Sequence, residues 1–232
     1  MKGKASFYLE VPEAYDSNLA EVLDFLKTWK DYLEGFFVPD LPLNKATLDA
    51  CAYLNEIIKI GKEAIPVQSV GHRSLTANKS RLQCLKHYGV KKVLLVQGPY
   101  KFTKVSDVLG YAVKRFTVGS VFNRRTLSNR ISSGVKFFVT QLFMFDASLE
   151  EIKKLKEFDV YVPVAVSDSN ESYRRLKEKG FAVPENFLNG DPFEEIRRFF
   201  ELLEQELGFA PKAYLVPLSK KVSLGPLFDI FK

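Results

Sequence analysis

Short apolar runs alternate with longer segments of helical apolar spacing along most of this chain. Each short run is rich in β-branched or aromatic residues, and in the segment after it apolar residues recur every three or four positions. Eight runs are predicted to be strands: residues 6–11, 36–39, 64–70, 92–97, 115–121, 136–141, 160–166 and 212–217. The first seven begin roughly 20 to 30 residues apart, the length of one strand, one helix and two short loops.

Several of these strands are apolar on both faces, as in KKVLLVQ, KFFVTQLF and VYVPVAV. Burial on both faces is typical of a parallel sheet covered by helices. The helix predicted after the first strand has such a covering face, because Leu19, Val22 and Leu26 form one apolar stripe while Glu21 and Lys27 face away. Eight strand–helix units fit a closed (β/α)8 barrel better than an open doubly wound sheet.

We therefore predict an α/β fold, a (β/α)8 TIM barrel that occupies residues 1–232 as one domain. Its last unit is expected to be irregular, because about 45 residues with two helical patterns separate the seventh strand from the eighth. After the eighth strand only SKKVSLGPLFDIFK remains, so the final helix is short or missing. A truncated last unit would leave apolar surface for a second copy or a partner subunit to cover.

Composition agrees with a folded globular chain, since 46% of the 232 residues are hydrophobic and 27% are charged. The sequence shows neither a secretory signal pattern nor an apolar run long enough for a membrane span, so we expect a cytoplasmic protein. Cys51 and Cys84 lack CxxC spacing and are expected to be reduced core residues of two helices.

The charge pattern argues against a nucleic-acid partner. Lys and Arg number 34 against 28 Asp and Glu, but most alternate with acidic residues along helices, as in EEIKKLKEFD. The small positive excess of 6 suits an anionic small molecule.

Candidate functional residues are the polar side chains that end apolar strands, because the active site of such a barrel lies at the carboxyl ends of its strands. This rule selects a short set: Glu10, Asp40, Gln68, Ser69, Gln97, Ser120, Gln141, Ser167 and Asp168.

Glu10 and Gln141 are the most informative of these. A carboxylate at an apolar mouth is partly desolvated, which suits Glu10 to proton transfer, although a solvated strand end or a salt bridge to Lys fits equally. Gln141 is costly in an apolar strand unless its amide is hydrogen-bonded, either to a heterocyclic ligand or to a neighbouring strand. Gly98 could admit a ligand close to the backbone or form a plain turn.

Neither histidine has metal-ligand spacing. His87 ends a helix and is expected on the surface, whereas His72 follows the third strand in a mouth loop. No GxSxG, GxxxxGK[ST], HExxH or GxGxxG pattern is present, so triad, P-loop and zinc-peptidase chemistry have no support, and no metal site is predicted.

In order along the chain, these residues resemble the methylenetetrahydrofolate reductase family. The most specific stretch is RTLSNRISSGVKFFVTQLFMFD, in which Thr140, Gln141 and Asp146 match the family pattern and Arg130 stands at its lysine. FYLEVP resembles the family's first strand, and IPVQSVGHRS followed by LKHYGVKKVLLVQGPY resembles its third and fourth strands.

The resemblance implies a flavoprotein that passes a hydride from NAD(P)H through FAD, with FMN as the alternative, to a methylene-tetrahydropterin. Glu10 would be the general acid and Gln141 would bind the pterin. The flavin would contact Arg130, Asn123 and Gly119, and the strand-end residues Ser69, His72 and Gly98 complete the expected cofactor site.

One departure from the family pattern leaves a second interpretation open. The family's fourth strand ends in Gly-Asp, whereas this chain has Gly98-Pro99, and either Asp40 or Gln97 would have to replace the missing acid at the substrate. The alternative is a binding or partner protein that keeps the pterin pocket and has lost the flavin chemistry.

Overall fold

Eight parallel strands close into one barrel in sequence order, from β1 through β8 and back to β1. The computed structural model describes residues 6–11, 19–40, 50–142, 149–219 and 222–231. The strands are β1 (Phe7–Glu10), β2 (Gly35–Val38), β3 (Glu63–Ser69), β4 (Lys92–Val96), β5 (Thr117–Val121), β6 (Phe137–Val139), β7 (Asp159–Val166) and β8 (Lys212–Pro217). Each lies within two residues of its predicted boundaries, so the predicted (β/α)8 fold is confirmed.

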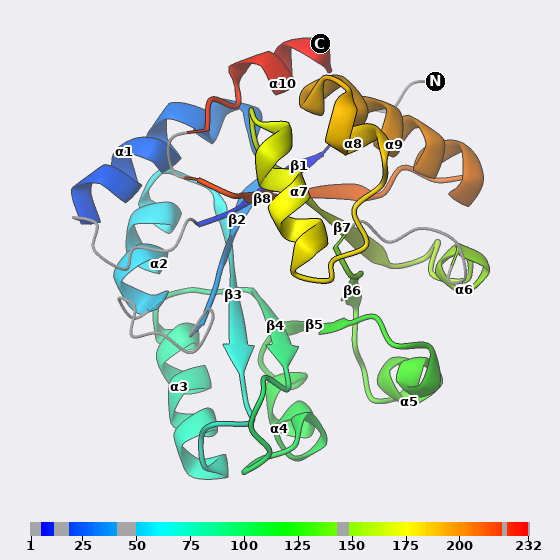
Figure 1. Cartoon of the computed structure of the whole chain (residues 1–232). Coiled ribbons are helices and arrows are strands. Elements are labelled where there is room, and N and C mark those ends of the chain that lie inside the picture. Colours follow the sequence, from blue (N-terminus) through cyan, green and yellow to red (C-terminus); the bar gives the residue numbers. More distant parts are fainter. Residues whose placement is uncertain (1–5, 12–18, 41–49, 143–148, 220–221, 232) are drawn as a thin grey trace.

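Helices surround this barrel (Figure 1). Those of the first six units are α1 (Leu19–Trp29), α2 (Ala50–Lys59), α3 (Leu75–His87), α4 (Val105–Ala112), α5 (Leu127–Ser132) and α6 (Leu149–Lys153). Single 3-10 turns, η1 (Lys30–Tyr32) and η3 (Arg124–Thr126), follow α1 and precede α5. The larger of two buried clusters lies between the strands and these helices and includes Leu26, Leu54 and Ile152.

The smaller buried cluster fills the inside of the barrel and is unusually aromatic. It consists of Tyr8, Phe37, Ile65, Leu94, Phe137, Val139, Tyr161 and Tyr214, with Val67, Val96 and Val216 packed against it. Its rings meet mainly edge to face, as between Tyr8 and Tyr161, whose centroids are 4.9 Å apart. Side chains therefore fill the barrel.

An ion network closes the amino-terminal end of the barrel interior. The ammonium of Lys92 lies 3.1 Å from the carboxylate of Glu63 and 3.4 Å from that of Asp159, which Lys212 approaches to 2.9 Å. Lys92 also donates to the hydroxyl of Tyr161. Opposite charges compensate one another here, as partly buried ions require, so this end is built for stability.

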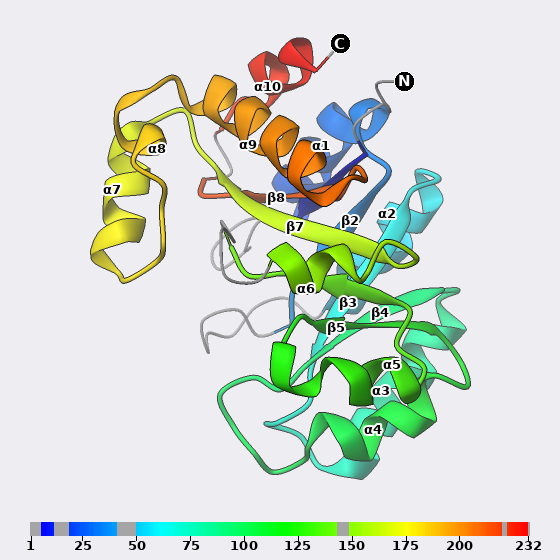
Figure 2. The ribbon, with the colours of Figure 1, turned by 90° about the vertical axis from the view of Figure 1, so that its right-hand side faces the viewer.

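The last unit is irregular, as predicted. Between β7 and β8 the chain forms α7 (Asn170–Glu178), α8 (Asn186–Asn189) and α9 (Pro192–Leu207), and α9 lies along β7 in Figure 2. Asp191 caps α9 by accepting hydrogen bonds from the backbone N–H groups of Phe193 and Glu194.

A short final helix, α10 (Gly225–Ile230), packs where the barrel closes. Its Phe228 meets Phe7 of β1 edge to face and stacks on Tyr32, with centroids 5.5 and 4.8 Å apart. These contacts cover apolar surface at the β8–β1 seam, although Tyr32 itself stays 43% exposed. Self-association through this region remains a prediction.

Cys84 does not lie in the core, so that prediction was wrong. The buried residues of α3 are Asn78, Leu82 and Leu85, which places Cys84 on the exposed face of the same helix. In the described residues, every helix is too short or too polar to cross a bilayer.

Candidate functional site

The carboxyl mouth of the barrel has an apolar floor. Val67 and Val96 of β3 and β4 and Val216 of β8 pack on the aromatic interior and are only half-buried themselves. Val121, at the end of β5, is 37% exposed. A flat apolar ligand surface would find complementary contacts there.

Glu10 stands at the edge of this floor. It lies two residues after the interior residue Tyr8 on the same strand, so its side chain is on the inward face. Tyr214 of β8 donates its hydroxyl hydrogen to the Glu10 carboxylate. Burial and the nearby Glu10 charge raise the pKa of Tyr214 well above its usual value, so the phenol remains protonated as a donor.

Gln141 lies just beyond β6 and is exposed. By strand alternation it follows the interior residue Val139 on the inward side. Within the described residues its side-chain amide has no hydrogen-bond partner, so the internal bond to a neighbouring strand is not formed. This amide is available to a ligand at the mouth. Asp146, from the same stretch of the family pattern, lies outside the described residues.

Asp40 is committed to a buried ion cluster. Two guanidinium nitrogens of Arg73 donate hydrogen bonds to its carboxylate, at 2.5 and 2.8 Å, and the guanidinium of Arg81 lies 3.4 Å from the same carboxylate. The backbone N–H of Ser69 also donates to it. Asp40 therefore ties the end of β2 to the β3 loop and α3, and its oxygens are occupied by protein donors.

Gln97 organises the loop after β4. Its amide nitrogen donates to the carbonyls of Tyr100 and Thr103, and its amide oxygen accepts from the N–H of Val105. The N–H of Phe102 donates to the carbonyl of Gly71. All of these bonds are internal, so Gln97 acts as a scaffold for the β4 loop.

Ser69, His72 and Gly98 form one tightly packed group beside that loop. The Ser69 hydroxyl lies 3.2 Å from Nδ1 of His72, and a Cβ on Gly98 would lie 2.1 Å from the same hydroxyl. Gly98 has a φ of +69°, which favours glycine. Burial and the charge of Arg73 lower the pKa of His72, and its buried Nε2 has no hydrogen-bond partner among the residues that the structure describes.

The other residues expected at a flavin have different neighbours. A Cβ on Gly119 would lie 2.0 Å from the ring of Phe137, so that glycine makes room for a core side chain. The Asn123 side chain accepts from the N–H of Arg125 and caps η3. Arg130 lies in the last turn of α5, which leads toward the amino end of β6.

These contacts are a poor fit to the expected flavin cradle. A cradle needs open glycine faces and donors directed at one place, whereas protein atoms occupy the Cβ side of both Gly98 and Gly119, and the Asn123 side chain caps η3. Gly71 is filled as well, since a Cβ there would lie 1.9 Å from the carbonyl oxygen of Tyr100.

Two important residues were missed by sequence reasoning. Tyr214 lies inside the strand KAYLVP, where a tyrosine is ordinary strand composition. Arg73 is one of many basic residues in loops, and its partner Asp40 is 33 positions away. No group of three or more His, Cys, Asp or Glu suited to a metal ion occurs in the described residues.

Comparison with known proteins yields a structural relative and no sequence relative. No protein-family model matches the chain, and no curated protein matches its sequence. Among solved structures, an uncharacterized protein from Clostridium thermocellum superimposes with a TM-score of 0.69 at 15% identity. The match covers 99% of this chain and 94% of the other, which is described as binding two copies of 5-methyl-5,6,7,8-tetrahydrofolic acid. The two chains share their fold over almost their whole length.

Proposed function

We propose that this protein binds a reduced folate at the carboxyl mouth of its barrel. The observation that carries the proposal is the Glu10 carboxylate, held by Tyr214 at the edge of an otherwise apolar floor. The pyrimidine edge of a pterin has adjacent N–H donors, which the two oxygens of one carboxylate can accept together. The reduced ring of the pterin would lie on the apolar floor.

Gln141 supplies a second polar group of the right kind. An amide both donates and accepts, so it can pair with the carbonyl and ring nitrogens of the same heterocycle. A small-molecule site usually combines an apolar surface with a small number of polar groups that orient the ligand.

The contact from Tyr214 supports an acceptor role for Glu10. The Tyr214 hydroxyl orients the Glu10 carboxylate by donating to one of its oxygens, and carboxylate oxygens have further lone pairs that can accept from a ligand N–H. The general-acid role implied by the family resemblance stays a prediction.

The structural relative gives independent support. That protein is described as a binder of 5-methyltetrahydrofolic acid, and its fold matches nearly all of this chain. A barrel of this fold is therefore compatible with a reduced folate as ligand.

Binding without flavin chemistry is the form of the proposal that the contacts favour. Flavin-dependent hydride transfer from NAD(P)H stays a prediction of the family resemblance. Of the glycines expected at the flavin, Gly98 has Ser69 on its Cβ side and Gly119 has Phe137 there.

Anaerobic calorimetry with 5-methyltetrahydrofolate tests the proposal. Wild-type protein should bind, and Glu10→Gln should weaken binding about 10- to 100-fold, the effect of losing one charged hydrogen-bond acceptor. The matched control is Glu157→Gln, an exposed residue before β7. Undetectable binding by the wild type, or equal affinities for Glu10→Gln and the control, would contradict the proposal.

A second experiment, with flavins, distinguishes a folate-binding protein from a flavin-dependent reductase. Protein is incubated with FAD or FMN, desalted, examined for the visible flavin absorption band, and then given NADH or NADPH without oxygen. We expect no retained flavin. A retained band that bleaches on addition of the nicotinamide would instead support the reductase.

A further inference from the structure

The loops after β4 and β5 lie opposite Glu10 and Tyr214. In a closed barrel of eight strands in sequence order, β1 faces β5 across the axis and β8 faces β4. The ordinary strand spacing and tilt place opposite strands about 15 Å apart. A ligand anchored at Glu10 and long enough to cross the mouth therefore reaches these two loops.

The two loops carry a concentration of positive charge. Lys101 and Lys104 follow β4, and Arg124 and Arg125 follow β5. The sole acidic residue from position 97 to position 130 is Asp107, which accepts from the N–H of Lys104. This side of the mouth therefore has a positive potential.

These four cations form few ion pairs with the described part of the protein. Within the described chain, Lys101, Lys104 and Arg125 form no ion pair, and the guanidinium of Arg124 lies 3.5 Å from Glu151 while its side chain is 70% exposed. Such an exposed pair is weak and easily exchanged for another anion.

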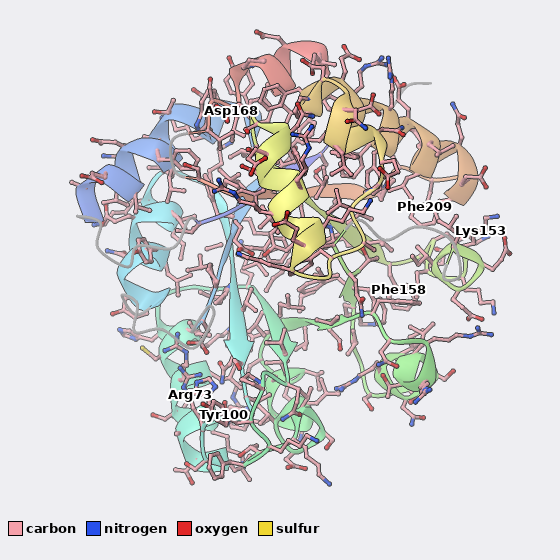
Figure 3. The ribbon with its side chains drawn as sticks, in the orientation of Figure 1. Arg73, Tyr100, Lys153, Phe158, Asp168 and Phe209 are labelled. Carbon is pink, nitrogen blue, oxygen red and sulfur yellow. The ribbon has the colours of Figure 1, made fainter. Side chains whose placement is uncertain are left out.

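An aromatic side chain stands among the lysines. Phe102 is 82% exposed and lies beside Tyr100, with ring centroids 6.5 Å apart and an angle of 21° between the planes. Figure 3 shows Tyr100 next to Arg73, on the loops that follow β4 and β3.

Hydrogen bonds from neighbouring residues fix this exposed loop. The Gln97 amide holds the carbonyls of Tyr100 and Thr103, the N–H of Phe102 donates to Gly71, and the Thr103 hydroxyl donates to the carbonyl of Arg73. Phe102 is therefore presented to solvent by an ordered loop. A preorganised aromatic surface binds a flat ring with little loss of conformational entropy.

We propose that Lys101, Phe102, Lys104, Arg124 and Arg125, together called the β4–β5 rim, bind the benzoylglutamate tail of a folate whose pterin lies at Glu10. The benzoyl ring would pack on Phe102, and the glutamate carboxylates would meet the four cations. This inference rests on the proposed function and adds the substrate class: folates with an anionic tail, preferred over tail-less tetrahydropterins.

Three ligands test the rim by anaerobic calorimetry: 5-methyltetrahydrofolate, its triglutamate form and 6-methyltetrahydropterin, which has no tail. Wild-type affinity should rise from the tail-less pterin to the monoglutamate and again to the triglutamate. The advantage of the tailed ligands should shrink as salt is raised, because exposed charges are screened.

Two rim variants should remove this preference. R124A/R125A should lower triglutamate affinity about tenfold, since two exposed charge contacts together contribute roughly 1.4 kcal/mol, and should leave the tail-less pterin unaffected. Phe102→Ala should weaken the binding of both tailed ligands, also about tenfold. Equal circular dichroism and melting temperatures will establish that the variants are folded.

Matched controls remove the same groups elsewhere. K91A/K136A deletes two exposed charges that precede β4 and β6 at the opposite end of the barrel, and Phe181→Ala deletes another exposed phenylalanine. Both controls should keep the wild-type preference for tails.

The outcomes separate the two proposals. If 6-methyltetrahydropterin and the folates bind but rim variants and controls behave alike, the rim assignment is overturned and the proposed function stands. If rim variants instead lose affinity for FAD or NADH while tail preference persists, the rim binds a dinucleotide and the tail assignment fails. If no pterin binds, both proposals fail together.

Discussion

Tyr214 donates its hydroxyl hydrogen to Glu10 across the seam where β8 pairs with β1. The two residues are 204 positions apart, yet they are adjacent because the last strand closes the barrel against the first. The Tyr214 ring stacks on Phe37, with centroids 4.0 Å apart. The position of the Glu10 carboxylate, which is proposed to bind the ligand, thus depends on the aromatic core beneath it.

Tyr214→Phe should weaken folate binding while leaving the fold intact. The variant keeps the ring stacked on Phe37 but removes the hydroxyl that orients Glu10, so affinity should fall roughly 3- to 10-fold, the effect of one ordinary hydrogen bond. Calorimetry with 5-methyltetrahydrofolate measures this loss.

A double-mutant cycle gives the control for that effect. If Tyr214 acts through Glu10, Tyr214→Phe should cost little further affinity in a Glu10→Gln background. Fully additive losses in the two backgrounds would mean that Tyr214 acts on the ligand independently of Glu10.

The fold could be predicted because the sequence repeats one local pattern. Every strand of the barrel is a short apolar run, and each is placed within two residues of its predicted ends. The position of Glu10 was predictable for the same reason, since strand ends define the mouth. The Tyr214 contact was not, because it depends on register between the two ends of the chain.

Glycines show a second limit of sequence reasoning. A glycine beside a strand end indicates that some atom approaches the backbone closely, but the sequence does not identify that atom. The atoms that would meet a Cβ at Gly119 belong to Phe137, and those at Gly98 belong to Ser69. Asp40 was likewise recognised as a polar strand end, although its partner Arg73 was not.

Gly119→Ala should destabilise the barrel. Its Cβ would overlap the Phe137 ring at 2.0 Å, and overpacking of this kind costs about 1–3 kcal/mol in the free energy of unfolding. Urea denaturation measures the loss. Phe137→Leu in the same chain should recover part of it by removing the ring edge.

Gly110→Ala is the matched control for that substitution. Gly110 lies inside α4, and a Cβ added there would have no neighbouring atom within 4 Å, so alanine should raise helix stability by up to about 1 kcal/mol. Loss of stability at Gly110 equal to that at Gly119 would show that the Phe137 contact is not the cause.

His72 should make stability depend on pH near neutrality. Burial and Arg73 lower its pKa in the folded state below the ordinary value of 6.5. The unfolded chain therefore binds more protons in this window, and stability falls as pH drops through 6.5 toward the folded pKa. In His72→Gln this part of the dependence should disappear, as measured by urea midpoints from about pH 8 to pH 5.

The exposed His87, at the end of α3, provides the matched substitution for the His72 test. Comparing His72→Gln with His87→Gln separates the effect of the half-buried His72 site from the effect of losing any one histidine. An unchanged slope in His72→Gln would mean that another group causes the pH dependence.

Asp159 should stabilise the fold at neutral pH and lose this effect in acid. Burial alone raises its pKa, but the hydrogen bonds and charges of Lys212 and Lys92 outweigh that effect, so the folded pKa lies below the ordinary value of 3.8. Its contribution is therefore complete above the unfolded pKa and disappears as pH falls through the folded one. Asp159→Asn should cost on the order of 1 kcal/mol at pH 7, because the carboxylate is 39% exposed.

The difference between wild type and Asp159→Asn should shrink below about pH 4, where the wild-type carboxylate becomes protonated. Asp24→Asn on the exposed face of α1 is the control, since it removes a carboxylate outside the network. A pH-independent difference would mean that Asp159 stabilises the barrel through packing. A difference that vanishes in acid would instead assign its effect to Lys92 and Lys212, and so to the ion network that closes the barrel opposite the candidate ligand site.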